Sequence, residues 1–253
     1  GWWSAIGGVV SAAGPVAGGV LTSGLGWRSI FFVNLPICAL GLWATRRYVA
    51  ETVRVAARRL DMTGQVLAIF ALFFLTHSVI EAGVQGWTTG SVLAGFAVAA
   101  VVIAVFVFNE SRVAEPMIPL GLFRSKAFSA SVVLGVIMNV TFYGMIFVLS
   151  LYFQNAKGYT PTRTGFALLP FVVIMLANLA SGRLAKRFSP KVPVIAGFLL
   201  LALSSALLHG IDETTPYLRI FPSLLLMAIG AGIATPGLIS LTLASVEPSR
   251  SAT

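Results

Sequence analysis

The chain of 253 residues is 57% hydrophobic and only 10% charged, with a mean hydropathy of +0.93. Soluble domains carry roughly a quarter charged residues, so this composition excludes an ordinary soluble enzyme or binding domain and indicates a polytopic membrane protein. Lys and Arg total 17 against 8 Asp and Glu, for a net charge of +9. Because the basic residues lie between apolar runs, they indicate membrane-protein loops rather than a nucleic-acid-binding patch.

The cysteine usage and the two ends of the chain add little about its compartment. Cys38, the single cysteine, lies within an apolar run and cannot form a disulfide within the chain. No secretory signal peptide is visible. The sequence opens directly in an apolar run and closes on the polar residues 249–253, so we expect it to be part of a longer protein.

Eight apolar segments are long enough to cross a membrane, which takes about 20 mostly apolar residues. They lie near residues 2–24, 29–48, 62–81, 90–108, 128–152, 164–182, 192–209 and 218–243. The connections between them are too short to hold a soluble domain. We therefore predict an all-α fold, a polytopic bundle of about eight transmembrane helices.

The first segment carries Gly14-Pro15, followed by Gly18-Gly19. Gly14 and Gly18 fall on one helix face, and a face without side chains lets another membrane helix approach closely. Pro15 removes a backbone donor and bends the helix. The simpler interpretation is a generic packing face, and the more specific one is the gating helix of a transporter. After this segment, Arg28 and Asn34 are expected to tie an external turn together rather than to contact a substrate.

The third segment begins at Asp61, which is expected to cap the helix and to suit its positive N-terminal end. Near its far end, His77 and Glu81 are spaced to pair on one helix face. They could act as an external proton relay, but the favoured interpretation is a hydrated helix end. No carboxylate lies in the middle of any segment. Asp61 and Glu110, for example, fall at predicted cytoplasmic ends.

The fifth segment places Asn139 deep in the predicted membrane, on a stripe with three- and four-residue steps. The stripe consists of Ser131, Gly135, Asn139, Phe142, Ile146 and Ser150. Asn139 either faces a transport cavity or makes a hydrogen bond between helices, worth about 0.6 to 2 kcal/mol. Tyr143 and Gln154 are further candidates for the transport pathway. Asn178, near a cytoplasmic end, is expected to pack.

Basic residues are distributed unequally between alternate connections. Thirteen fall in one set: Arg46, Arg47, Arg54, Arg58, Arg59, Arg112, Arg124, Lys126, Arg183, Lys186, Arg187, Lys191 and Arg250. Four fall in the other set: Arg28, Lys157, Arg163 and Arg219. Because cytoplasmic loops carry the excess of Lys and Arg, the first set is predicted to be cytoplasmic.

The glycine motif of the first segment, with the motif after it, resembles the antiporter motif of the major facilitator superfamily. The second motif is Trp27-Arg28-x-x-Phe31-x-x-Asn34-x-Pro36. In that family the two motifs lie in the fifth span and at the start of the sixth. The loop from Gly182 and Arg183 through Arg187 to Lys191 resembles the superfamily's cytoplasmic basic loop.

Further motifs resemble the 14-span drug:proton antiporters of this superfamily. They are Asp61-x-x-Gly64 with Gly86-Trp87, Glu110 with Pro116 and Leu122-Phe123-Arg124, and Gln154 with Gly158-Tyr159 and Leu169-Pro170. On this resemblance the chain corresponds to spans five to twelve. Residues 1–50 then hold the last two spans of the N-terminal bundle. Residues 51–126 hold a cytoplasmic loop, two linker spans and a connection, and residues 127–253 hold the first four spans of the C-terminal bundle.

The resemblance implies proton-coupled efflux of hydrophobic or cationic drugs by alternating access, in the cytoplasmic membrane of a bacterium. The implied partners are the lipid bilayer, a small-molecule substrate and protons, with no nucleic acid and no cofactor. No metal-binding or catalytic motif is visible, so an enzyme is not expected. In this family the coupling carboxylate is commonly in the first span, outside this chain.

Two alternatives stay open at this point. One is an exporter of the same superfamily that carries a metabolite or a siderophore. The other belongs to a different class, a membrane sensor or scaffold that transports nothing.

Overall fold

The computed structural model describes the backbone of residues 2–49 and 61–244, with side chains from residue 14 onward in those ranges. Four residues of the predicted cytoplasmic loops, Arg54, Arg58, Arg59 and Arg250, lie outside the described residues. Within the described ranges every regular element is a helix, and no strand occurs. The predicted all-α fold class is therefore confirmed.

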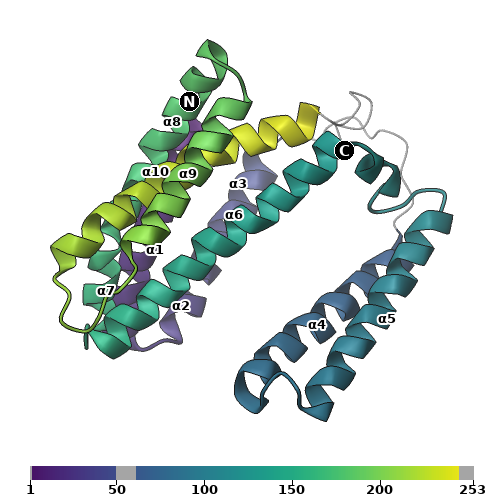
Figure 1. Ribbon diagram of the computed structural model, residues 1–253, viewed down its shortest axis with the longest axis horizontal. Coiled ribbons are helices and arrows are strands. Elements are labelled where there is room, and N and C mark those ends of the chain that lie inside the picture. The colour runs from purple at the N-terminus through teal and green to yellow at the C-terminus, as the bar shows by residue number, and fades with distance from the viewer. Residues whose placement is uncertain (1, 50–60, 245–253) are drawn as a thin grey trace. The chain divides into compact units, whose positions relative to one another are not determined.

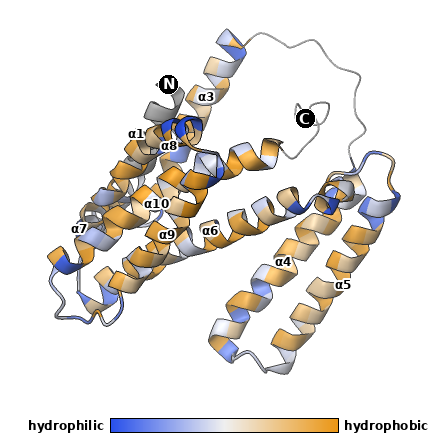
Figure 2. Cartoon of the chain, turned by 45° about the horizontal axis from the view of Figure 1, so that its top comes forward, coloured by the Kyte–Doolittle hydropathy of each residue, from blue (hydrophilic) through white to orange (hydrophobic). Residues whose placement is uncertain are grey.

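Each of the eight predicted segments is helical. The elements are α1 (Trp2–Leu25), α2 (Ser29–Phe32), α3 (Asn34–Tyr48), α4 (Met62–Gln85), α5 (Gly90–Arg112), η1 (Leu120–Arg124), α6 (Lys126–Leu151), η2 (Tyr152–Ala156), α7 (Pro161–Ala167), η3 (Leu169–Val173), α8 (Ile174–Arg187), α9 (Lys191–Leu207) and α10 (Tyr217–Ala244). Among the described residues, six helical stretches are long and apolar enough to cross a membrane, and α9 is a shorter apolar helix of 17 residues. Figure 2 shows the apolar residues along the helices and the hydrophilic ones gathered at their ends.

Two predicted segments are broken by proline. Pro36 cannot donate to the carbonyl of residue 32, four positions earlier, and the helix is interrupted at Val33 between α2 and α3. In the same way Pro170 accompanies the break at Leu168, where the short 3₁₀ turn η3 separates α7 from α8. The α6 helix ends differently, in the π turn η2, whose last bond runs from the N–H of Lys157 to the carbonyl of Tyr152.

The chain divides into two compact units, and each is described by itself. Unit 1 comprises residues 1–49 and 125–253, and unit 2 comprises residues 50–124. In unit 1, α10 packs against both α8 and α9, as Figure 1 shows. Ile220, Leu224 and Met227 of α10 are buried in this core. The assignment of these ranges to transporter bundles is a prediction.

Small and hydroxylated residues let the unit 1 helices approach closely. The hydroxyls of Ser204 on α9 and Ser223 on α10 each donate to the other residue's carbonyl oxygen, at 2.9 Å. These bonds satisfy two buried polar groups, as a membrane core requires. The hydroxyl of Ser181 likewise donates to the carbonyl of Ile233 at 2.7 Å, which joins α8 to α10.

Unit 2 is built on the helix pair α4 and α5, joined by a turn at Gly86, whose φ of 93° favours glycine. Small residues are buried along the contact, among them Ala71 and Ala82 on α4 and Ala99 on α5. Asp61 caps α4 as predicted, because its Oδ1 accepts a hydrogen bond of 2.8 Å from the N–H of Gly64.

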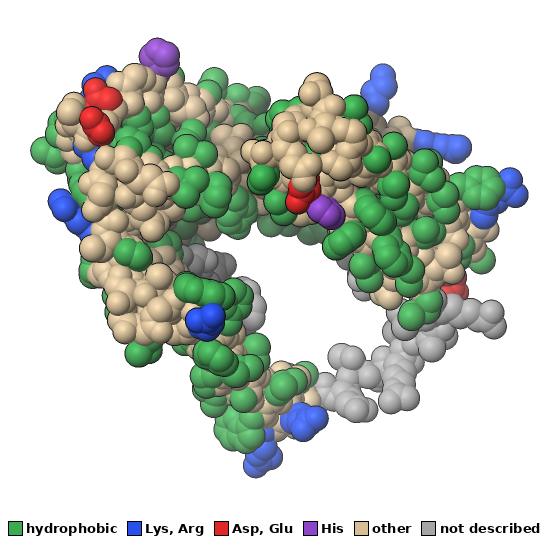
Figure 3. Space-filling model, turned by 90° about the horizontal axis from the view of Figure 1, so that it is seen from below, with side chains coloured by type: hydrophobic (Ala, Val, Ile, Leu, Met, Phe, Trp, Pro, Cys, Tyr) green, Lys and Arg blue, Asp and Glu red, His purple; other side chains and the backbone are tan. Residues whose placement is uncertain are grey.

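The outer surface is largely apolar. Figure 3 shows hydrophobic side chains over much of the face in view, with few Lys and Arg. Large exposed side chains such as Leu40, Phe73, Val101 and Phe147 belong to four different helices. Water-soluble proteins rarely expose so much apolar surface, so these helices are built to face lipid or further transmembrane helices.

Candidate functional site

Among the described residues, the backbone of α1 comes closest to that of α7. Two glycines allow this close approach. A Cβ added to Gly19 would overlap the carbonyl oxygen of Pro161 and lie 3.0 Å from the Pro161 carbonyl carbon. A Cβ added to Gly165 would overlap the carbonyl oxygen of Pro15 in the same way. The two backbones therefore touch where only glycine fits, which confirms that a small-residue face of α1 permits close approach.

The contact with α7 is made at Gly19, and not at the two glycines that the sequence singled out. Gly14 and Gly18 were expected to make the close contact, but a Cβ at either position would meet no described atom within 4 Å. Gly19 is the buried glycine of the motif, whereas Gly14 is exposed. Successive residues of a helix point about 100° apart, so the direction from which α7 arrives decides which glycine it needs.

Hydrogen bonds fix α7 against α1. The hydroxyl of Thr162 donates to the carbonyl oxygen of Gly19 at 3.1 Å and lies 2.9 Å from the Ser23 hydroxyl oxygen. The sequence places Thr162 there because Thr160 caps α7 and Pro161 occupies its first turn, where no backbone donor is needed. Sequence reasoning missed Ser23 and Thr162, although the Thr-Pro-Thr run was a visible signal for a helix start.

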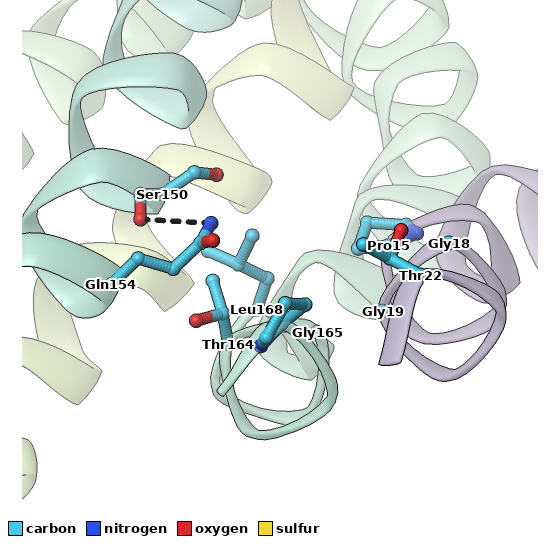
Figure 4. A pocket seen from close by; sticks show the side chains of 10 residues that line it. Pro15, Gly18, Gly19, Thr22, Ser150, Gln154, Thr164, Gly165 and Leu168 are labelled. Carbon is cyan, nitrogen blue, oxygen red and sulfur yellow. Dashed lines mark hydrogen bonds between the residues drawn. The ribbon is translucent and has the colours of Figure 1, made fainter. Parts of the chain in front are cut away.

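A pocket of about 210 Å³ opens beside this contact, between α1, the end of α6 with η2, and α7. Figure 4 shows Pro15 and Gly18 on one side and Gln154 and Ser150 on the other. The full lining is Pro15, Gly18, Gly19, Thr22, Ser150, Gln154, Pro161, Thr164, Gly165 and Leu168. No charged side chain is among these ten residues. The pocket thus brings three residues of the glycine motif together with Gln154, a predicted pathway residue.

The polar groups around this pocket are incompletely paired. Gln154 is exposed, and its side-chain Nε2 makes one long bond of 3.4 Å to the carbonyl of Ser150. The Thr164 hydroxyl oxygen is buried and has no hydrogen-bonding partner. Hydroxyl and amide groups in an apolar wall can orient a small molecule without binding its charge.

The structure does not bring Asn139 and Tyr143 to this pocket. Both side chains are exposed on α6, and the Asn139 amide donates to the carbonyl of Gly135 in its own helix at 2.8 Å. The alternative of a hydrogen bond between helices is therefore not formed among the described residues. Of the predicted stripe, Ser131 is buried and Ser150 lines the pocket, so only one end of the stripe reaches this pocket.

The exposed Asn139 allows a clean test of the pathway prediction. In the full-length protein, Asn139→Ala should change which compounds are exported while the protein accumulates normally in the membrane. An amide that faces a transport path contributes to substrate binding, whereas this one adds no bond between helices. Uptake of a panel of compounds and immunoblotting of membranes measure the two quantities. Reduced abundance with an unchanged compound panel would contradict the pathway role.

The turn after α1, which is predicted to be external, is held by a residue that the sequence analysis did not single out. The Ser29 hydroxyl lies 2.7 Å from the carbonyl oxygen of Gly26 and 3.1 Å from that of Leu21. Of the predicted residues, Arg28 stacks on Trp27 at 4.7 Å. The Asn34 amide, at the start of α3, donates at 3.0 Å to the carbonyl of Ile30 in α2, across the break at Val33.

At the end of unit 1 where α7 begins, Lys157 joins two turns. Its ammonium donates to the carbonyl oxygens of Glu213, at 2.7 Å, and of Thr215. The Asp212 carboxylate accepts hydrogen bonds from Thr214 and Thr215, which lower the pKa of Asp212 to about 2. This cluster ties the connection after α6 to the α9–α10 turn.

Most of the predicted basic loop is helical, because α8 runs to Arg187 and α9 starts at Lys191. Gly182, Arg183, Arg187 and Lys191 are all exposed, and a Cβ on Gly182 would meet no described atom within 4 Å. The guanidinium of Arg187 lies over the Phe188 ring at 5.5 Å. In the described residues these basic side chains lie at the polar ends of α8 and α9, and their cytoplasmic location stays a prediction.

The remaining titratable candidates form no catalytic or metal centre in the described part of the chain. His77 meets the ring of Phe73, and Glu81 accepts instead from Gln85, so no His77–Glu81 pair is formed. No group of three or more His, Cys, Asp or Glu residues is placed to hold a metal ion among the residues that the structure describes.

Apolar helices long enough to cross a membrane, packed into a bundle, define a multi-pass membrane protein. The Major Facilitator Superfamily model matches residues 1–253, and the chain belongs to that family.

Three curated relatives are named as resistance or export proteins. The chain is 38% identical to the "Methylenomycin A resistance protein" of Streptomyces coelicolor, over 98% of this chain and 52% of the relative. It is 38% identical to the "Multidrug resistance protein Stp" of Mycobacterium tuberculosis, over 82% of this chain and 39% of the relative. It is 37% identical to the "Tetracenomycin C resistance and export protein" of Streptomyces glaucescens, over 81% of this chain and 38% of the relative. The chain thus spans about half or less of the length of these relatives.

Proposed function

We propose that the full-length protein exports antibiotics or other drugs across the cytoplasmic membrane of a bacterium. The observation that carries this proposal is the backbone contact of α1 with α7 at Gly19 and Gly165, next to a pocket with a neutral lining. In the predicted assignment, α1 belongs to the N-terminal bundle and α7 to the C-terminal bundle. The resistance and export functions named for the relatives support the same conclusion.

Alternating access explains why such a contact is useful. Transporters of this kind rock one bundle against the other around a site near the middle of the membrane. A contact made by backbone atoms forms only at one separation of α1 and α7, so it favours one arrangement of the bundles. The Thr162 hydroxyl adds hydrogen bonds to Gly19 and Ser23 in that arrangement. We propose that this contact is made in one transport state and lost in the other.

The energy source in this proposal is the proton gradient. Among the described residues no carboxylate lies in the middle of an apolar helix, so the coupling group is assigned to a part of the full-length protein outside this chain. Hydrophobic or cationic compounds are the proposed substrates.

Efflux measurements test the proposal directly. Cells that lack their own exporters and express the full-length protein should accumulate less drug than empty-vector cells. An ionophore that collapses the proton gradient should abolish the difference. Unchanged accumulation across a panel of drugs, with the protein present in the membrane, would favour a sensor or scaffold and would contradict export.

A further inference from the structure

Unit 2 contains a buried carboxylate that the α1–α7 site does not use. Glu110 lies in the last turn of α5 and is 3% exposed. Its Oε2 accepts a hydrogen bond of 2.7 Å from the backbone N–H of Ile118, in the connection that follows α5. Its other oxygen, Oε1, is buried and has no hydrogen-bonding partner.

A second carboxylate lies beside this oxygen. Asp61 uses Oδ1 to cap α4, and its Oδ2 accepts a hydrogen bond of 3.2 Å from the Asn109 side chain. A Cβ added to the buried Gly64 would overlap Asp61 Oδ2 and lie 2.8 Å from Glu110 Oε1. Both oxygens therefore face the same point above the first turn of α4, and the absence of a side chain at Gly64 keeps that point open.

The arrangement has an electrostatic cost that a bound cation would remove. Burying a carboxylate oxygen without a hydrogen-bond donor costs free energy, because the oxygen loses its bonds to water and no bond within the protein replaces them. A second carboxylate nearby adds repulsion. One positive charge shared by the two oxygens relieves both penalties. The single negative charge that remains on the pair suits its place at the positive N-terminal end of α4.

The charged groups that the structure describes around the two carboxylates leave this role open. Besides Asp61 and Glu110, the charged residues on α5, on its connection to α6 and on η1 are Arg112, Glu115 and Arg124. The guanidinium of Arg112 lies over the ring of Phe108, at 5.0 Å, and Glu110 Oε1 accepts no hydrogen bond from any of these residues. In the described residues no third acidic, imidazole or thiol group completes a chelating metal centre, which favours a cation of low charge.

We propose that Asp61 and Glu110 together bind one monovalent cation, a proton or an alkali metal ion, through Asp61 Oδ2 and Glu110 Oε1. Because Glu110 Oε2 also holds the N–H of Ile118, the bound cation stabilises the start of α4, the end of α5 and the following connection as one structure. The site is independent of the proposed export function and of the pocket beside α7.

Thermal unfolding of the purified full-length protein tests the site, with protons, NaCl and KCl as probes. Lowering the pH at fixed choline chloride should raise the melting temperature by a few degrees if the cation is a proton, because only the folded protein holds that proton between the two carboxylates. Replacing choline chloride by NaCl or KCl at fixed pH should raise it if the cation is an alkali metal ion.

Glu110→Gln should remove the dependence in either case, because the amide can donate to Asp61 Oδ2 in place of the cation. Asp61→Asn is the second variant and should have the same effect if Glu110→Gln does not accumulate. Glu213→Gln, which changes an exposed carboxylate in unit 1, is the matched control and should leave the dependence unchanged. A wild-type protein that responds to neither pH nor alkali ions would overturn the proposal, as would a response that persists in both variants.

Discussion

Gly19→Ala should lower drug export by the full-length protein roughly 5- to 150-fold, while the protein still accumulates in the membrane. The added Cβ would overlap the carbonyl oxygen of Pro161, a backbone atom that cannot rotate away. Overpacking of this kind costs about 1–3 kcal/mol. That cost falls on the transport state in which α1 and α7 touch, and a penalty of this size shifts a two-state equilibrium by the stated factor. Initial rates of drug efflux, normalised to protein in the membrane, measure the effect.

Gly24→Ala is the matched control for this experiment. It adds the same methyl group to an exposed glycine of the same helix that does not line the pocket and has no described atom within 4 Å. It should export nearly as well as the wild type. Gly165→Ala should repeat the loss from the other side of the contact, because its Cβ would overlap the carbonyl oxygen of Pro15. Equal export by Gly19→Ala and Gly24→Ala would show that the contact is not needed for transport.

The difference between Gly18 and Gly19 shows what a single sequence can and cannot predict. The motif predicted that α1 has a face for close approach, because three glycines and a proline in one apolar helix have few other uses. It could not predict the register, since that depends on where α7 lies. The position of α7 depends in turn on Thr160, Pro161 and the break at Leu168, far away in the chain.

The helices themselves were predictable from local physics. Apolar runs of the required length gave all eight segments, and the two breaks follow from prolines that cannot donate a backbone hydrogen bond. Burial of polar side chains was not predictable in the same way. Glu110 resembles an ordinary charged residue at a helix end, and only the connection that folds back to place Ile118 on it makes it a buried group.

Gly197→Val should prevent the full-length protein from accumulating, in contrast to Gly19→Ala. A Cβ on Gly197 would lie 2.5 Å from the carbonyl oxygen of Gly230 and 2.6 Å from the Cβ of Ala234. Gly230 in turn approaches the carbonyl oxygen of Gly197, so α9 and α10 have no room for a branched side chain between them. Since α10 is the centre of the unit 1 core, separating it from α9 also disturbs the bonds between Ser204 and Ser223.

The cost at Gly197 applies to every state of the protein, because α9 and α10 belong to the same unit. Each such clash costs about 1–3 kcal/mol, a large part of the 5–15 kcal/mol by which most proteins are stable. Membrane abundance and the melting temperature of the purified protein should therefore both fall. Gly144→Val on α6 adds the same side chain where no described atom lies within 4 Å, and it should leave both quantities near the wild-type values. Normal abundance of Gly197→Val would mean that α9 and α10 separate without loss, and that their close crossing does not hold unit 1 together.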